Sequence, residues 1–125
     1  AHRHFLQCPP KPEGWAFDQS ATQHQPRYGG RPDGAAVDVL GNYWVAMYEG
    51  ARVCQFAPSG TLLAEYPTPA QCPTMPCFGG DDLKTLYLTS ARKGRSAAEL
   101  LALPQSGGVF AMRVDVAGLP VNFFG

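Results

Sequence analysis

One carboxylate in this sequence has neighbours that suit it to chemistry. Asp33 lies between Pro32 and Gly34, just ahead of the apolar run Ala35–Val39. A carboxylate is a hard oxygen ligand for Ca²⁺, Mg²⁺ or Mn²⁺, and it can also take a proton from an attacking water molecule. The alternative is a purely structural turn, because Asp before Gly often caps its own backbone. The spacing alone leaves both interpretations open, and the turn is the commoner one.

Thr74 is the second candidate, because it takes the place of Asp33 in a later repeat of the pattern. Pro32-Asp33 precedes one strand pattern, and Pro73-Thr74 precedes the next, at Cys77-Phe78. A hydroxyl in this position can contact a substrate, or it can cap a turn. Our hypothesis is that Thr74 lines the same cavity as Asp33 and binds substrate there.

The remaining reactive side chains form no recognisable site. We expect the cysteines to be free and mostly buried, rather than disulfides or metal ligands, because they lack the paired spacing of a zinc knuckle. The histidines fall in an irregular N-terminal stretch and are expected to be solvated. No catalytic triad pattern, phosphate loop or dinucleotide fingerprint is found. The residues concerned are Cys8, Cys54, Cys72, Cys77, His2, His4 and His24.

Short β-strands joined by tight turns are predicted to position Asp33. Gly41-Asn42, Glu49-Gly50 and Pro58-Ser59-Gly60 have turn composition, and the segments between them alternate or are β-branched and aromatic. This pattern predicts strands at Ala35–Val39, Tyr43–Tyr48, Arg52–Ala57 and Thr61–Tyr66. Four strands in such close succession form a meander, which is typical of a propeller blade.

A second, looser copy of the meander follows. Tyr43–Ala46 matches Leu86–Thr89, and Arg52–Phe56 matches Gly108–Met112. Ser96–Leu103 interrupts the copy and predicts a short helix, with Ser96 as N-cap and Glu99 completing a capping box. We therefore predict a single domain over 1–125. Residues 1–29 are predicted to be an irregular remnant of a preceding blade, with short strands at 2–7 and 15–18. Residues 30–70 form one blade, and residues 71–125 form a second blade with a helical insertion.

The composition argues against nucleic-acid-binding and membrane proteins. Hydrophobic residues make up 45% and charged residues 16% of the 125 positions, which suits a folded domain. Ten Lys and Arg balance ten Asp and Glu, so nothing favours nucleic acid or an anionic membrane surface. No apolar run approaches the roughly 20 residues of a membrane span, and the first residues do not resemble a signal peptide. We expect a soluble, cytoplasmic protein.

Several motifs together resemble the regucalcin–gluconolactonase (senescence-marker-protein-like) family of sugar lactonases. They extend from about Gly30 to Phe124 and are specific as a set. They are Gly30-Arg31-Pro32-Asp33-Gly34-Ala35, Val37-Asp38, Gly41-Asn42-Tyr43-Trp44-Val45-Ala46, Cys72-Pro73-Thr74-Met75, Phe78-Gly79-Gly80, Leu83–Arg92 and Gly107-Gly108-Val109-Phe110.

This resemblance implies an all-β fold, a partial β-propeller that corresponds to the C-terminal half of a six-bladed one, with four-stranded antiparallel blades. Family members hold one divalent cation (Ca, Mg, Mn or Zn) and hydrolyse sugar lactones. Asp33 matches the aspartate among the family's metal ligands, which implies a metal-binding and catalytic role. The family's glutamate and asparagine ligands and its substrate-binding arginine and asparagine would lie ahead of Ala1.

Two functions follow from the resemblance. The first is a metal-dependent sugar lactone hydrolase that needs a missing N-terminal half, so whether the isolated chain is an enzyme stays open. The second is a non-catalytic half-propeller that acts as a self-associating or binding module. An unclosed array of blades exposes apolar faces and unpaired strand edges. We therefore expect a homo-oligomer, most simply a dimer, unless the N-terminal half is supplied or residues 1–29 fold back as a cover.

Overall fold

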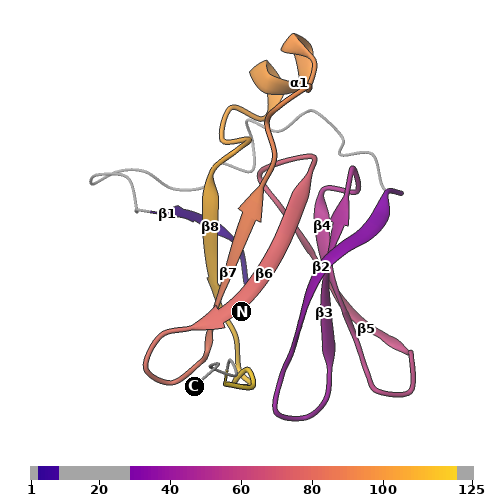
Figure 1. The fold of residues 1–125 in the computed structure, drawn as a ribbon, viewed down its shortest axis with the longest axis vertical. Helices are drawn as coiled ribbons and strands as arrows, with labels where there is room; N and C mark the ends of the chain where they lie inside the picture. The colour runs from indigo at the N-terminus through magenta and orange to yellow at the C-terminus, as the bar shows by residue number, and fades with distance from the viewer. Residues whose placement is uncertain (1–2, 9–28, 121–125) are drawn as a thin grey trace, which may run out of the picture.

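The computed structural model describes residues 3–8 and 29–120, and two four-stranded antiparallel sheets stand side by side in it (Figure 1). The predicted all-β class with four-stranded antiparallel sheets is confirmed. The elements are β1 (Leu6–Cys8), β2 (Arg31–Val37), β3 (Tyr43–Tyr48), β4 (Arg52–Phe56), β5 (Leu62–Pro67), β6 (Pro73–Gly79), β7 (Thr85–Ser90), α1 (Ala97–Ala102) and β8 (Val109–Arg113).

The first sheet is the predicted meander, in the order β2-β3-β4-β5. Strand β3 has the predicted bounds, β4 ends one residue earlier than predicted, and β5 is shifted by one residue towards the C-terminus. In β3, Trp44 and Ala46 are buried in the core while Tyr43 is exposed, as expected for a sheet with two unlike faces.

The second sheet is not the predicted meander, because its order is β1-β8-β7-β6. Strand β1, from the start of the chain, supplies the fourth strand by pairing Leu6 with Ala111 and Cys8 with Val109. The residues after β8 turn back across the fold instead, since the amide of Gly118 donates to the Leu83 carbonyl at 2.8 Å. The free edge of β8 therefore pairs with β1. The other N-terminal strand, predicted at 15–18, lies outside the described residues.

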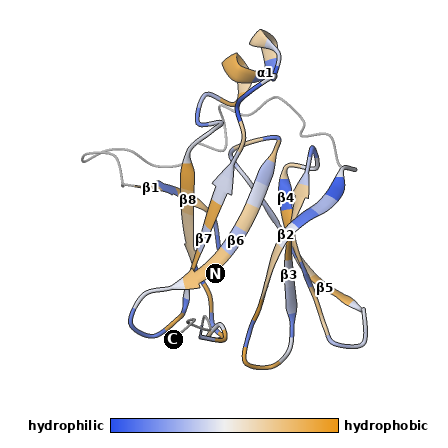
Figure 2. Cartoon of the chain, in the orientation of Figure 1, coloured by the Kyte–Doolittle hydropathy of each residue, from blue (hydrophilic) through white to orange (hydrophobic). Residues whose placement is uncertain are grey.

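The core lies between the two sheets. Trp44 of β3 contacts Phe78 of β6 edge-on, with ring centroids 5.8 Å apart, and stacks on Tyr66 of β5 at 5.5 Å. Apolar segments recur along the strands of both sheets (Figure 2). Alternate residues of each sheet thus form one shared core, whose members are Phe5, Trp44, Ala46, Val53, Ala70, Phe78, Leu86, Leu88, Phe110, Met112 and Val114.

A buried carboxylate organises the turn between β2 and β3. Asp38 accepts hydrogen bonds from the backbone amides of Leu40 and Asn42, both at 2.9 Å, and from Asn42 Nδ2 and Trp44 Nε1, both at 3.0 Å. Burial by itself raises the pKa of Asp38, but the hydrogen bonds together outweigh burial, so the pKa lies below its usual range. The turn is therefore fixed by an ionised side chain.

The predicted helix is confirmed as α1, with Ser96 as its N-cap. The Ser96 hydroxyl accepts from the Glu99 amide at 3.1 Å. The Glu99 carboxylate accepts from Arg95 at 2.7 and 2.8 Å. None of the helical residues is buried, and α1 stands away from the sheets, beyond the end of β7 (Figure 1). No helix in the described ranges is long and apolar enough to cross a membrane.

Candidate functional site

Asp33 and Thr74 lie at equivalent irregularities of the two sheets. On β2, two residues, Asp33 and Gly34, fall between the register pairs Pro32↔Met47 and Ala35↔Val45, where the partner strand has one. On β6, Thr74 and Met75 fall between Pro73↔Ser90 and Pro76↔Leu88 in the same way. Each pair is a β-bulge. Both residues were predicted to precede their strands, which is wrong, because both strands begin earlier than their apolar runs.

The two bulges touch. A Cβ added at Gly34 would lie 2.6 Å from the carbonyl oxygen of Thr74, closer than real side chains come, and it would also meet Met75 Sδ. Gly34 is therefore needed for close approach of β2 to β6 rather than for a left-handed turn. The contact brings the exposed Asp33 and the half-buried Thr74 to adjacent strands at the same end of the fold.

Thr74 has a hydroxyl partner that the sequence analysis missed. Thr74 Oγ1 lies 2.7 Å from Thr89 Oγ1, and Thr89 Oγ1 is 3.4 Å from the Met75 carbonyl. A carbonyl only accepts, so when Thr89 donates to Met75, Thr74 donates to Thr89 and keeps lone pairs for a donor on a ligand. Little in the sequence indicated this partner, because the residue of the first sheet that aligns with Thr89 is Ala46, which has no hydroxyl.

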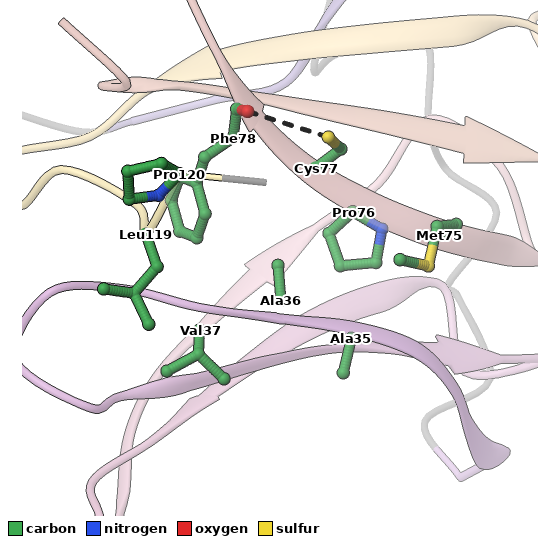
Figure 3. A pocket seen from close by; sticks show the side chains of 9 residues that line it. All are labelled: Ala35, Ala36, Val37, Met75, Pro76, Cys77, Phe78, Leu119 and Pro120. Carbon is green, nitrogen blue, oxygen red and sulfur yellow. Dashed lines mark hydrogen bonds between the residues drawn. The ribbon is translucent and has the colours of Figure 1, made fainter. Parts of the chain in front are cut away.

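An apolar pocket of about 230 Å³ continues from the bulges between β2 and β6 (Figure 3). It is closed at one end by Leu119 and Pro120, and its most polar lining side chain is the Cys77 thiol, whose Sγ lies 3.6 Å from the Phe78 carbonyl. Asp33 and Thr74 are not among the lining residues; they lie two residues before Ala35 and one residue before Met75. The lining residues are Ala35, Ala36, Val37, Met75, Pro76, Cys77, Phe78, Leu119 and Pro120.

Charged side chains near the bulge end are paired. Arg31 lies over the ring of Tyr48, 5.0 Å from its centroid. Arg95, just before α1, contacts Glu49 in the β3–β4 turn at 3.1 Å as well as Glu99. The hydrogen bond with Glu99, followed by that with Glu49, raises the pKa of Arg95 above its usual range. Arg95 therefore ties the helical insertion to the first sheet.

The described residues do not complete a metal site. They contain no group of three or more His, Cys, Asp and Glu side chains placed to hold a metal ion. Asp33 offers one carboxylate, whereas Ca²⁺ takes six to eight oxygen ligands. A cation at Asp33 would need ligands from outside these residues.

The cysteines are free, as predicted. Cys54 and Cys72 are buried, Cys8 is half-buried and Cys77 is exposed. Burial raises the pKa of the Cys54 and Cys72 thiols. They are therefore poor nucleophiles and poor metal ligands at neutral pH. Of the histidines, His4 is exposed, and His2 and His24 lie outside the described residues.

Relatives of known name match most of the chain. A 6-deoxy-6-sulfogluconolactonase of Pseudomonas putida is 56% identical over 96 residues, which cover 77% of this chain and 33% of that protein. Regucalcin of Bos taurus is 41% identical over 91 residues, covering 71% of this chain and 30% of regucalcin. The matched part therefore spans about a third of the length of these relatives.

Solved structures give the same result. The crystal structure of a calcium-binding protein, regucalcin, from Agrobacterium tumefaciens has a TM-score of 0.67 at 32% identity, covering 70% of this chain and 30% of that one. A luciferin-regenerating enzyme has a TM-score of 0.63 at 31% identity, covering 76% and 33%. The model of the SMP-30/gluconolactonase/LRE-like region matches residues 3–92, which include Asp33 and Thr74. The chain belongs to the SMP-30/gluconolactonase/LRE-like family.

Proposed function

We propose that this chain is part of a sugar lactone hydrolase and forms the portion of its propeller that carries Asp33. The observation that supports the proposal is the close approach of the two bulges, which carry Asp33 and the Thr74–Thr89 hydroxyl pair, beside an apolar pocket. The names of the relatives support it, since one is a lactonase.

Lactone hydrolysis needs a base for the attacking water and groups that orient the sugar ring. In our proposal Asp33 takes a proton from the water as its oxygen attacks the lactone carbonyl carbon. The ring C–O bond then breaks, and the departing alkoxide receives the proton that Asp33 took from the water, so that lactone and water give one hydroxy acid. Thr74, held by Thr89, accepts a hydrogen bond from a hydroxyl of the substrate.

The same carboxylate is our proposed ligand for a divalent cation. A regucalcin of similar structure is described as calcium-binding, which makes Ca²⁺ the first ion to test. Such an ion would polarise the lactone carbonyl. Asp33 supplies one ligand, and the remaining ligands would come from the part of the propeller that this chain does not include or from another copy.

Hydrolysis by the chain combined with the rest of its propeller tests the proposal. Acid release from a sugar δ-lactone is measured with added Ca²⁺, Mn²⁺ or Zn²⁺, and Ca²⁺ binding is measured by calorimetry. We expect Asp33→Ala to remove both signals and Asp81→Ala, which alters an exposed carboxylate in the β6–β7 turn, to keep them. Thr74→Val should raise KM with little change in kcat. Signals that survive Asp33→Ala would overturn the assignment of Asp33.

The second candidate is a non-catalytic, self-associating module. The exposure of large apolar side chains on both sheets favours it, among them Leu6, Val37, Tyr43, Leu62 and Tyr87. Absence of both hydrolysis and Ca²⁺ binding when the chain is combined with the rest of its propeller would decide for this alternative.

A further inference from the structure

The segment between β7 and β8, which we call the helical insertion (residues 91–108), starts and ends beside the Thr74 bulge. The Ser90 hydroxyl closes its base, because it donates to the Gly108 carbonyl at 2.8 Å and accepts from the preceding amide at 3.0 Å. Ser90 directly follows Thr89, whose hydroxyl contacts that of Thr74. The base of the helical insertion is therefore fixed next to the hydroxyl pair of the candidate site.

Arg95 connects the helical insertion to the first sheet. Its guanidinium binds Glu99 of α1 through three hydrogen bonds of 2.7, 2.8 and 3.1 Å, and it binds Glu49 of the β3–β4 turn at 3.1 Å. Glu49 directly follows Tyr48, whose register partner on β2 lies two residues ahead of Asp33. In Figure 1, α1 stands at the end of the fold where β2 and β6 begin. The helical insertion therefore spans from the surroundings of one bulge to those of the other.

The charge of Arg95 is already matched by protein carboxylates. The side chain of Arg95 is 20% exposed and that of Glu99 is 11% exposed, so this pair is largely shielded from water. The fourth hydrogen bond, to Glu49, reaches the other sheet. Any effect of Arg95 on a reaction is therefore exerted through the position of the helical insertion and not through contact with a substrate.

Glu49 has an unfavourable backbone conformation at the point where it meets Arg95. Its φ of 64° lies in the left-handed region, which glycine adopts freely and residues with a side chain adopt at a cost. Glycine would suit this position of the turn better, but it has no carboxylate to bind Arg95. A backbone outlier of this kind motivates a functional role for the side chain that it carries.

We propose that Arg95 is a positioning residue of the candidate site, and that the helical insertion is the wall that selects the ring substituents of the lactone. This inference rests on the proposed function. The bridge to Glu49 sets the distance of the helical insertion from the bulges, and thereby the orientation of a substituted ring over Asp33. A wall that contacts the substituents, rather than the lactone carbonyl, favours sugar lactones over the unsubstituted ring.

Hydrolysis of two δ-lactones by the chain combined with the rest of its propeller tests this role. One is a sugar δ-lactone, and the other is δ-valerolactone, which has the same ring without hydroxyl groups. Glu49→Gln removes the ionic contact with Arg95. Glu65→Gln is the matched control, because Glu65 is 45% exposed against 47% for Glu49, and its contact with Arg52 is also 3.1 Å long. We expect Glu49→Gln to lower kcat/KM about tenfold for the sugar lactone alone, and the control to change neither value.

Glu49→Gly separates the positioning role from folding. It removes the carboxylate but relieves the backbone, so its thermal unfolding temperature should equal or exceed that of the wild type while the selective loss remains. An equal loss for both lactones, or no loss for either, would overturn the positioning role and leave the proposed function standing. A wild type that hydrolyses neither lactone would overturn the proposed function and the positioning role with it.

Discussion

Trp44 Nε1 and Asp38 Oδ2 are joined by a 3.0 Å hydrogen bond that links the core to a turn. The indole ring packs between the two sheets, while its only donor reaches a carboxylate with no exposed surface. One side chain therefore holds the β2–β3 turn, which follows the strand of Asp33, in a fixed relation to the sheet interface.

Replacing Asp38 should cost stability and change its dependence on acid. Asp38→Ala leaves the donors of Trp44 and Asn42 buried and unpaired, which should lower the free energy of unfolding by about 3 kcal/mol. The pKa of Asp38 is lower in the folded chain than in the unfolded chain. Its contribution is therefore complete above pH of about 4 and lost as the pH falls through the folded-state pKa.

Urea unfolding from neutral pH to pH of about 2 measures this effect. The difference in stability between wild type and Asp38→Ala should shrink as the pH falls. Asp38→Asn is the matched variant: it retains an oxygen for the backbone amides of Leu40 and Asn42 but turns a donor towards Trp44. A pH-independent difference would contradict the ionised state of Asp38.

Gly34 should tolerate no side chain. Gly34→Ala forces β2 and β6 apart at the bulges and should destabilise the chain by about 2 kcal/mol, a typical cost of overpacking. Thermal unfolding measures the loss. Met75→Ala in the same chain removes the clash with the Met75 side chain but leaves that with the Thr74 carbonyl, so it should restore little. Full recovery in the double variant would show that only the side chain sets the approach.

Arg95 should hold the helical insertion in place. Arg95→Ala removes its contacts with Glu49 and Glu99, and we expect faster amide hydrogen exchange in α1 and in the β3–β4 turn. Because the pairs are partly exposed, the global stability should fall by less than about 1 kcal/mol. Leu101→Ala serves as control, since its side chain packs on nothing that would be lost. Unchanged exchange in Arg95→Ala would show that α1 is held by other contacts.

The thiols should react in two classes. Cys77 is exposed, and Cys54 and Cys72 are buried with raised pKa values, so a disulfide reagent at pH of about 8 should label Cys77 first and the buried pair only on unfolding. Cys77→Ser should remove the fast phase. Reaction of Cys54 or Cys72 at the same rate would contradict the packing of the strands that carry them.

The strands of the first sheet could be predicted from the sequence because each lies beside its partner along the chain. Tyr43–Tyr48 has the aromatic and β-branched residues typical of a strand, and the turns around it have characteristic residues. Strand β1 could not be placed, since nothing near Leu6 in the sequence indicates a partner at Ala111. The start of β2 was missed because Pro32 and Gly34 read as a turn, whereas a bulge accommodates them within the strand.

The candidate residues Asp33 and Thr74 were chosen from the repeat, and their role stays a prediction. The structure shows that the two bulges that carry them approach each other closely at Gly34. The contact between the Thr74 and Thr89 hydroxyls and the need for glycine at position 34 were missed. Both depend on how closely strands approach each other in space, which residue spacing along the chain does not reveal.

The pairing of β1 with β8 has a consequence for how the chain is made. Arg3 donates to the Arg113 carbonyl across 110 positions of sequence, so the segment that forms β1 must wait for the segment that forms β8 before the two can pair. The β2–β5 meander needs only neighbouring segments and can form during synthesis, whereas the second sheet keeps an open edge until β8 has been made. That interval is when a nascent chain is most exposed to mispairing with another, and a chaperone that shields strand edges should act on this sheet first.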